Sequence, residues 1–522
     1  MPLATCRIST GRARWALAAA PVLAAALAAA APAAAKDCAE LAGAAVPDGK
    51  ITAATLVPAG GFELPPALRP PPGVPAASFK SLPAFCRVQA TLTPSPDSDI
   101  KVEVWLPASG WNGKLVGIGN GVWAGSISYF ELGRPLSLGY AVSANDTGHV
   151  GNGLTADFAV GHPEKLTDFG YRAVHATAVA AKAAIADFYG DKPKLSFWNS
   201  CSTGGRQGLM EAYRYPEDYD AISAMAPANP MTDLMTQSLW SGYQAVRTPW
   251  AGVSQAKLAA LHKAYLEQCD ARDGLKDGIA ADPRACRFDP AVIQCKGADA
   301  PDCLTEEQLK TMRAVYAGPP GIGGFPTGSE MQLPVLLAGK EPFPVATSYF
   351  RLLVFAGQPG WDFRKFDYAA DAARGRDFGA KILDVPPGGL GPFFARGGRL
   401  LLSHGWTDGL IPATNTVKFY GELQSKVPGK ARKEQLRLFM VPGMNHCSGG
   451  EGAYAFDTLG TIDAWASGGP APERIVATRP PGPDGKPPLT RPLCAFPLVA
   501  RYKGQGPEDQ AESFACAAPS KG

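Results

Sequence analysis

The sequence predicts an α/β fold in which one domain with a largely parallel sheet is interrupted by a long insertion. Strand and helix patterns alternate in the first half of the chain, stop from 229 to 389, and resume from 390 onwards. Such alternation is typical of parallel sheets that carry helices on both faces. We therefore expect residues 36–228 and 390–522 to form the sheet domain, and residues 229–389 to form an inserted lid domain.

The strand predictions rest on short apolar or β-branched runs bounded by turn residues. The expected strands are 101–107, 114–119, 139–144, 195–198, 219–225, 399–404 and 435–441. The helix predictions rest on apolar residues that recur with the helical period. The expected helices are 168–189, 204–215 and 414–425.

Residues 1–35 are predicted to be a secretory signal peptide. Three arginines precede an Ala/Leu/Val run from about Trp15 to Ala31, and three small alanines end the segment. This order of charged, apolar and small residues is typical of cleaved export signals. A single membrane anchor is the alternative, although an apolar run rich in alanine inserts weakly. We expect a secreted or periplasmic protein that has no membrane attachment after cleavage.

The composition excludes some partners. Loss of residues 1–35 removes three arginines and no acidic residue, so the formal net charge falls from +3 to zero. A neutral chain has no electrostatic preference for nucleic acid or for an anionic membrane, and we expect neither as a partner.

Ten of the eleven cysteines remain after the signal peptide is removed. An even number in an exported chain favours disulfides. Zinc binding is the weaker alternative, because no two cysteines have the Cys-x2-Cys spacing and the chain has only six histidines. The ten residues are Cys38, Cys86, Cys201, Cys269, Cys286, Cys295, Cys303, Cys447, Cys494 and Cys516.

Ser202 lies in the turn Ser-Cys-Ser-Thr-Gly-Gly-Arg that follows the expected strand 195–198. A serine on a sharp strand-to-helix turn is the nucleophile elbow of α/β hydrolases. The bend exposes the hydroxyl, and the unpaired N–H groups that begin the helix can stabilise an oxyanion, so the N–H of Thr203 is a candidate donor. Ser200 stands where the usual motif has its first glycine, so the turn alone is equally consistent with a structural role.

Asp408 and His446 each follow a later expected strand, which gives the chain order Ser, Asp, His found in α/β hydrolases. An imidazole can take the serine proton near neutral pH, and a carboxylate can fix the tautomer of that imidazole. We predict Ser202, Asp408 and His446 as the catalytic residues. His404 is the rival base, but His446 alone follows the last expected strand.

Cys201 precedes the predicted nucleophile and Cys447 follows the predicted base. If Ser202 and His446 touch, these cysteines are close enough for a disulfide that would hold the two in register. The alternative is that Cys201 is a small buried packing residue.

The Cys-Ser-Thr-Gly-Gly-Arg segment and the later His-Cys pair resemble the tannase and feruloyl esterase family, which includes the mono(2-hydroxyethyl) terephthalate hydrolases. The resemblance covers essentially the whole mature chain. It implies an α/β-hydrolase fold with a large inserted lid domain. It also implies four further disulfides, which join Cys38 to Cys86, Cys269 to Cys286, Cys295 to Cys303, and Cys494 to Cys516.

The second oxyanion donor is expected in the glycine-rich loop 119–125, which is similar to a loop of that family. We predict the N–H of Gly121. The family usually has a second glycine where this chain has Val122, which leaves the choice of donor open.

Three carboxylates lie within eight residues of the insertion, beside glycines that permit a tight loop. Such a loop suits a hard cation that prefers oxygen ligands. It lacks the glutamate at position twelve of an EF-hand loop, and a solvated acidic turn is the alternative. The resemblance implies a structural Ca²⁺ held by the side chains of Asp270, Asp273 and Asp277 and the carbonyls of Leu275 and Ile279. We expect no organic cofactor.

The segment 348–355 is expected to form a helix of the lid with Arg351 and Phe355 on one face. The guanidinium could hold a substrate carboxylate and the ring could cover an aromatic acyl group, similar to an arginine and a phenylalanine of terephthalate-monoester hydrolases. An arginine paired inside the lid beside a core phenylalanine is the alternative.

Together these features predict a secreted serine carboxylic-ester hydrolase that acts through an acyl-enzyme. The expected substrate is a small ester of an aromatic acid of the feruloyl, galloyl or terephthalate-monoester type. One alternative is an acyltransferase of the same fold, in which a second alcohol replaces water. The other is an extracellular binding protein that has lost catalysis, against which the intact set of Ser, Asp and His argues.

Overall fold

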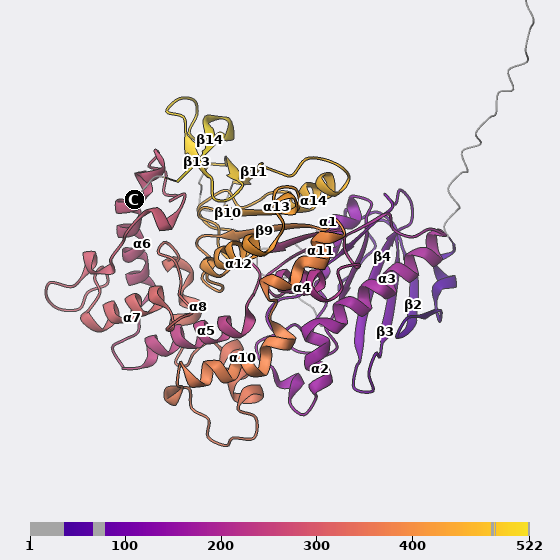
Figure 1. The fold of residues 1–522 in the computed structure, drawn as a ribbon, viewed down its shortest axis with the longest axis horizontal. Helices are drawn as coiled ribbons and strands as arrows, with labels where there is room; N and C mark the ends of the chain where they lie inside the picture. The colour runs from indigo at the N-terminus through magenta and orange to yellow at the C-terminus, as the bar shows by residue number, and fades with distance from the viewer. Residues whose placement is uncertain (1–35, 66–78, 482–484, 486, 520–522) are drawn as a thin grey trace, which may run out of the picture. The chain divides into compact units, whose positions relative to one another are not determined.

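A ten-stranded sheet forms the centre of the computed structural model, which describes residues 36–65, 79–481, 485 and 487–519 (Figure 1). The strand order is β1-β2-β3-β4-β6-β5-β7-β8-β9-β10. The strands are β1 Ala45–Val46, β2 Gly49–Val57, β3 Phe85–Leu92, β4 Ile100–Pro107, β5 Lys114–Gly117, β6 Ala141–Asn145, β7 Leu195–Cys201, β8 Ala221–Met225, β9 Arg399–Gly405 and β10 Leu436–Val441. The predicted signal peptide lies outside the described residues.

The sheet has an antiparallel part and a parallel part. Strands β1 to β4 pair antiparallel, and β4 also pairs antiparallel with β6. From β6 through β5, β7, β8 and β9 to β10, every neighbouring pair is parallel. The strands β9 and β10 are buried almost throughout, as expected for parallel strands covered on both faces. The carboxyl ends of β7, β9 and β10 therefore meet at one edge, where chain segments that follow them can lie together.

Helices cover both faces of the sheet. Alternate residues of β7 point to opposite faces, so Phe197 belongs to one buried cluster and Trp198 to another. The first cluster includes residues of α1 (Tyr129–Ser137) and α14 (Thr458–Ala466), and the second includes residues of α4 (Thr203–Arg214) and α12 (Ala413–Lys426). Helix α3 (Ala173–Tyr189) covers the antiparallel part on the side of α4 (Figure 1).

Between β8 and β9 the chain adds no strand to the sheet, and the structure describes every residue of that segment. At the left and lower left of Figure 1, beside the parallel strands, lie α5 Met231–Val246, α6 Gln255–Cys269, α7 Glu306–Ala317, α8 Pro334–Leu337, α9 Pro344–Ser348 and α10 Ala370–Leu383. The last helix of the segment, α11 Gly391–Ala395, packs against α4 instead. The indole of Trp123, from the loop after β5, donates to the carbonyl of Val345 at 3.0 Å, which ties this segment to the sheet. The exact limits 229 and 389 stay a prediction.

Three features extend the predicted element list. Strands β1 to β3 were not expected from the sequence, although Val88, Ala90 and Leu92 of β3 alternate with polar residues and are a strand signal. Two small hairpins end the chain, β11 (Arg474–Arg479) with β12 (Leu489–Cys494) and β13 (Val499–Tyr502) with β14 (Phe514–Ala517). The remaining helices of the sheet part are α2 Pro163–Thr167 and α13 Gly429–Gln435.

The expected helix 168–189 begins with a π-helical turn, Asp168–Arg172. Arg206 of α4 is completely buried beside this turn and donates to the carbonyls of Phe169 at 3.2 Å and Gly170 at 2.9 Å. A π turn leaves carbonyls available to such a donor, and both terminal nitrogens of the buried guanidinium obtain partners, while its Nε has none among the described residues.

All five disulfides that the sequence and the family resemblance implied are bonded in the structure. One joins Cys38, in a 3₁₀ turn near the start of the described chain, to Cys86 of β3. Within the described ranges, no helix has the length and apolar composition that a bilayer crossing requires.

Candidate active site

Ser202 lies between the end of β7 and the start of α4, with φ 64° and ψ −127°. A non-glycine residue in this region is strained, and such strain is typical of functional turns that the surrounding structure enforces. The strand, sharp turn and helix form the nucleophile elbow that the sequence predicted.

Two glycines make the elbow possible. A Cβ on Gly204 would lie 2.1 Å from the Oγ of Ser200, and a Cβ on Gly205 would lie 2.5 Å from the carbonyl oxygen of Met225. The bare backbone at Gly204 therefore leaves room for a serine at position 200, where the usual motif has glycine.

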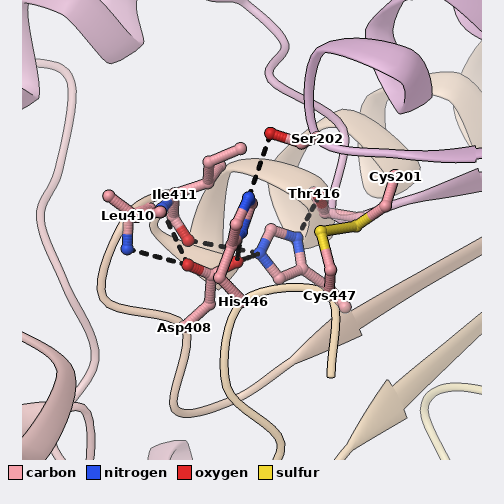
Figure 2. The surroundings of a disulfide bond; sticks show 9 residues. Cys201, Ser202, Asp408, Leu410, Ile411, Thr416, His446 and Cys447 are labelled. Atoms are coloured by element: carbon pink, nitrogen blue, oxygen red, sulfur yellow. Dashed lines mark hydrogen bonds and ion pairs between the residues drawn. A yellow bond between two sulfur atoms is a disulfide. The ribbon is translucent and has the colours of Figure 1, made fainter. Parts of the chain in front are cut away.

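His446 joins Ser202 to Asp408 (Figure 2). Its Nε2 lies 3.0 Å from Ser202 Oγ, and its Nδ1 lies 2.7 Å from Asp408 Oδ2. The other carboxylate oxygen of Asp408 accepts from the backbone N–H groups of Leu410 at 2.8 Å and Ile411 at 2.9 Å. The three side chains named as catalytic candidates thus form one hydrogen-bonded chain, although they come from three separate strand ends.

His404, the rival base, lies on the far side of the same carboxylate. Its Nε2 is 3.1 Å from Asp408 Oδ2, and its Nδ1 is 2.7 Å from the hydroxyl of Thr416. The imidazole of His404 is fully buried, and both of its nitrogens are occupied by these contacts. His446, and not His404, therefore contacts Ser202.

The contact between Asp408 and His446 shifts the pKa of each of these two groups. Burial alone would raise the pKa of Asp408, but the opposite charge of His446 and hydrogen bonds from His404 and His446 hold it well below its usual range. Burial alone would lower the pKa of His446, but the charge of Asp408 and the hydrogen bond to it raise this pKa above 6.5. Because Asp408 is ionised and the basicity of His446 is raised, the imidazole of His446 is suited to take up a proton from Ser202.

A disulfide joins the residue before Ser202 to the residue after His446 (Figure 2). The Cα atoms of Cys201 and Cys447 are 6.0 Å apart and 246 residues apart in the sequence. Because the bond spans the two neighbouring positions, it limits how far the imidazole can move from the hydroxyl.

The two residues whose N–H groups are expected to bind an oxyanion, Thr203 and Gly121, both line the cavity at Ser202. Thr203 is the first residue of α4, and N–H groups at a helix start have no acceptor within the helix. Gly121 lines the cavity in front of Ser202, and the described residues provide no acceptor for its N–H. The neighbouring Val122 has φ 44°, a region that favours glycine, and its carbonyl accepts from the Thr203 hydroxyl at 2.7 Å.

The cavity in front of Ser202 is mainly apolar. One wall comes from α5, where Met231, Leu234, Met235 and Ser238 recur with helical spacing on one face. Other lining residues come from the loops: Ala228, Phe343, Val345, Leu410 and Ile411. Sequence reasoning missed this wall, although the spacing in α5 is a signal that could have indicated it.

Arg351 and Phe355 are not among the described residues that line this cavity. The segment Tyr349–Val354 is a π helix, in which the N–H of Phe355 bonds to the carbonyl of Phe350. Arg351 is exposed, whereas Phe355, the residue at which this helix ends, is buried against Trp361. The expectation of a shared face is therefore wrong, and the substrate role of these two residues has no support from the cavity.

The acidic loop of the inserted segment, where a calcium ion is expected, surrounds a small cavity. Four of the five expected ligand residues, Asp273, Leu275, Asp277 and Ile279, line one small cavity. Burial raises the pKa of Asp273 to about 7, and the nearby carboxylates of the loop add to this effect. Within the described residues, a single ion pair, from Arg491 to Asp277, offsets the negative charge. Asp270 is buried and accepts from the N–H of Gly278 at 2.8 Å, which closes the loop.

A second cluster, outside the cavity, contains His175, Glu211 and Asp218, whose ligand atoms lie within 4.8 Å of one another. His175 Nδ1 is 2.6 Å from Asp218 Oδ2, and the Lys182 ammonium is 3.5 Å from the other oxygen of that carboxylate. The Lys182 ammonium thus supplies a positive charge to the cluster, and burial raises the pKa of Glu211 well above its usual range.

Known proteins resemble this chain in sequence and in structure. The family described as tannase and feruloyl esterase matches residues 86–335 and 353–517. An uncharacterized esterase of Xanthomonas campestris is 35% identical over 546 residues, covering 93% of this chain and 92% of the relative. A mono(2-hydroxyethyl) terephthalate hydrolase of Piscinibacter sakaiensis is 32% identical, covering 85% and 86%. The crystal structure of feruloyl esterase B from Aspergillus oryzae superimposes with a TM-score of 0.83 at 27% identity, covering 92% and 99%.

The sheet, its helices and these structural neighbours define an α/β hydrolase with a large additional segment, as the sequence predicted. Members of the tannase and feruloyl esterase family are carboxylic ester hydrolases. The chain belongs to the tannase and feruloyl esterase family.

The disulfide beside the site should matter more to activity than one elsewhere. We expect the double substitution of Cys201 and Cys447 by serine to lower kcat/KM for an aromatic ester by about tenfold or more, because the imidazole is no longer held against Ser202. The matched control replaces Cys295 and Cys303, which close a loop of only eight residues.

The two disulfides close loops of very different length, so their removal should also lower the free energy of unfolding by different amounts. The loss of unfolding free energy should be about 3 kcal/mol larger for the first pair, because a longer loop is released in the unfolded chain. Steady-state kinetics and denaturant unfolding measure both effects. Equal losses of activity per folded molecule would contradict the role given to the Cys201 disulfide.

Proposed function

We propose that this protein is a secreted serine esterase that hydrolyses esters of aromatic acids through an acyl-enzyme. The observation that carries the proposal is the hydrogen-bonded chain from Ser202 through His446 to Asp408, which opens on a mainly apolar cavity. Such a chain supplies a nucleophile, a base and an orienting carboxylate, which are the groups that acyl transfer needs.

In the first half of the proposed reaction, the hydroxyl oxygen of Ser202 attacks the ester carbonyl. His446 Nε2 takes the hydroxyl proton, and Asp408 holds the imidazole in the tautomer that has Nε2 free. The negative charge that develops on the carbonyl oxygen is stabilised by the N–H groups of Thr203 and Gly121.

In the second half, the tetrahedral intermediate collapses and its C–O bond to the alcohol breaks. His446 gives its proton to the leaving alcohol, and the acyl group stays on Ser202 as an ester. Water then attacks this ester while His446 again takes a proton, and a second collapse releases the carboxylic acid and restores the Ser202 hydroxyl.

The aromatic acyl group is proposed from the cavity and from the relatives. Apolar side chains of α5 and the flanking loops suit a planar ring. Relatives at 32% identity carry the names feruloyl esterase B and mono(2-hydroxyethyl) terephthalate hydrolase. The sequence suggested that the Arg351 guanidinium binds the free carboxylate of a terephthalate monoester. Because Arg351 does not line the cavity, this part of the substrate proposal has no support from the cavity.

Export is proposed on two grounds. Residues 1–35 have the pattern of a signal peptide, and the described chain contains five disulfides. Disulfides persist in oxidising compartments, such as the periplasm and the extracellular medium.

A structural Ca²⁺ is proposed for the acidic loop. The side chains of Asp270, Asp273 and Asp277 and the carbonyls of Leu275 and Ile279 would hold it. The ion would neutralise the excess carboxylate charge of the loop and connect it through Asp277 and Arg491 to β12. The role is structural, because none of these residues lines the cavity at Ser202.

Substitution of the proposed nucleophile is the direct test. Ser202→Ala should lower turnover of an aromatic ester by more than about 10⁴-fold and abolish the pre-steady-state burst, because no acyl-enzyme can form. Ser425→Ala changes an exposed serine of α12 and should leave both unchanged. Stopped-flow kinetics with an activated aromatic ester measures the burst, and retained turnover in Ser202→Ala would remove the residue from this role.

The raised pKa of His446 predicts the pH dependence. Only the neutral imidazole can act as the base, so kcat/KM should rise with pH and reach half its maximum above pH 6.5. Asp408→Asn removes the charge that raises this pKa, so the midpoint should move to lower pH while the maximum falls by about 10⁴-fold. A pH profile of both proteins tests this, and an unshifted midpoint would argue that Asp408 does not set the basicity of His446.

Removal of the proposed calcium should destabilise the protein. A chelator should lower the thermal unfolding midpoint by several degrees, since an ion that binds only the folded state stabilises it. The double substitution of Asp273 and Asp277 by asparagine should abolish this sensitivity, whereas Asp191→Asn, at an exposed turn, should keep it. Calorimetry with and without chelator decides the matter, and an identical midpoint for the unmodified protein would eliminate the site.

A further inference from the structure

Glu131 lines the same cavity as Ser202 and His446. The other described lining residues are apolar, neutral polar or disulfide-bonded, so Glu131 and His446 are the ionisable groups of this lining. The proposed reaction uses His446 and leaves Glu131 without a role.

Helix α1 fixes the position of Glu131. Tyr129, Leu132 and Leu136 are buried in the core on one face of the sheet, and the Tyr129 hydroxyl donates to Glu103 at 2.9 Å. Glu131 lies on another side of the helix, and its side chain is solvent-accessible. Since the buried residues anchor α1 on both sides of position 131, the carboxylate is held at the cavity wall.

The carboxylate of Glu131 has no hydrogen bond or ion pair with any residue that the structure describes. A ligand that fills the cavity displaces water from this carboxylate, and no described side chain replaces the lost hydration. A donor that the ligand brings therefore stabilises the carboxylate. The rest of the lining is mainly apolar, so the ligand loses much of its own water as well.

We propose that Glu131 accepts a hydrogen bond from a hydroxyl group of the substrate and thereby selects hydroxyl-bearing esters. This inference rests on the proposed function, because it assigns a specificity residue to the same site. A carboxylate is a strong acceptor, and a hydrogen bond to a charged group discriminates more than one between neutral groups. An ester without the hydroxyl leaves Glu131 desolvated and unpaired, so the site rejects it.

The hydroxyl has two chemical sources. It belongs either to the ring of the aromatic acid, as in a phenol, or to the alcohol that leaves. Two matched pairs of esters separate these sources. Methyl 4-hydroxycinnamate and methyl cinnamate differ by one ring hydroxyl. The 2-hydroxyethyl and propyl esters of cinnamic acid differ by one hydroxyl on the alcohol.

The test compares kcat/KM within each pair for the unmodified protein and for Glu131→Leu and Glu131→Gln, above pH 8, where the carboxylate is ionised. In the unmodified protein, one pair should favour the hydroxyl-bearing ester by about tenfold or more. That preference should disappear in Glu131→Leu and fall in Glu131→Gln, whose amide oxygen is a weaker acceptor. The pair that responds identifies the source of the hydroxyl.

Controls distinguish failure of this inference from failure of the proposed function. Glu422→Gln changes an exposed glutamate of α12 and should keep every ratio. Continued hydrolysis of methyl cinnamate by the Glu131 variants shows that the fold and the reaction are intact. If both ratios then equal those of the unmodified protein, the inference is overturned while the function stands. Hydrolysis that survives Ser202→Ala would instead overturn the function.

Discussion

The buried carboxylate of Asp408 is the group on which the site depends. It accepts from two imidazoles and two backbone N–H groups, and no part of it reaches solvent. An ionised carboxylate at such a depth is stable only with this number of partners. The partners in turn fix where the carboxylate points, so His446 has one direction in which it can donate. The strained elbow, the two glycines of α4 and the adjacent disulfide then bring Ser202 to the opposite nitrogen.

Much of this arrangement is predictable from sequence, and the reason is the parallel sheet. Strands buried on both faces read as continuous apolar runs, so β7, β9 and β10 were placed within a few residues. Residues that follow parallel strands meet at one sheet edge. The expectation that Ser202, Asp408 and His446 lie together needed only that rule and their chain order. The Cys201–Cys447 pair followed from the expected contact of Ser202 and His446, whereas the other four disulfide pairs depended on family resemblance, because spacing alone does not determine connectivity.

The cavity wall was less accessible to sequence reasoning. Which residues face Ser202 depends on how α1 and α5 pack against the sheet, and the local sequence of each helix does not contain that information. In the sequence, Glu131 is an acidic residue in the first turn of a helix. Such residues commonly interact only with the helix dipole. The exposure of Arg351 and the burial of Phe355 depend on how their segment packs in the lid, and the local sequence 348–355 does not contain that information.

The bond between Cys201 and Cys447 has a further consequence for where the protein can work. It connects the two chain segments that carry Ser202 and His446, and thiols pair stably only where the surroundings are oxidising. In reducing surroundings this restraint is lost, so the imidazole and the hydroxyl are free to move apart. The geometry of the site is thus tied to the redox state of the surroundings in which the chain folds.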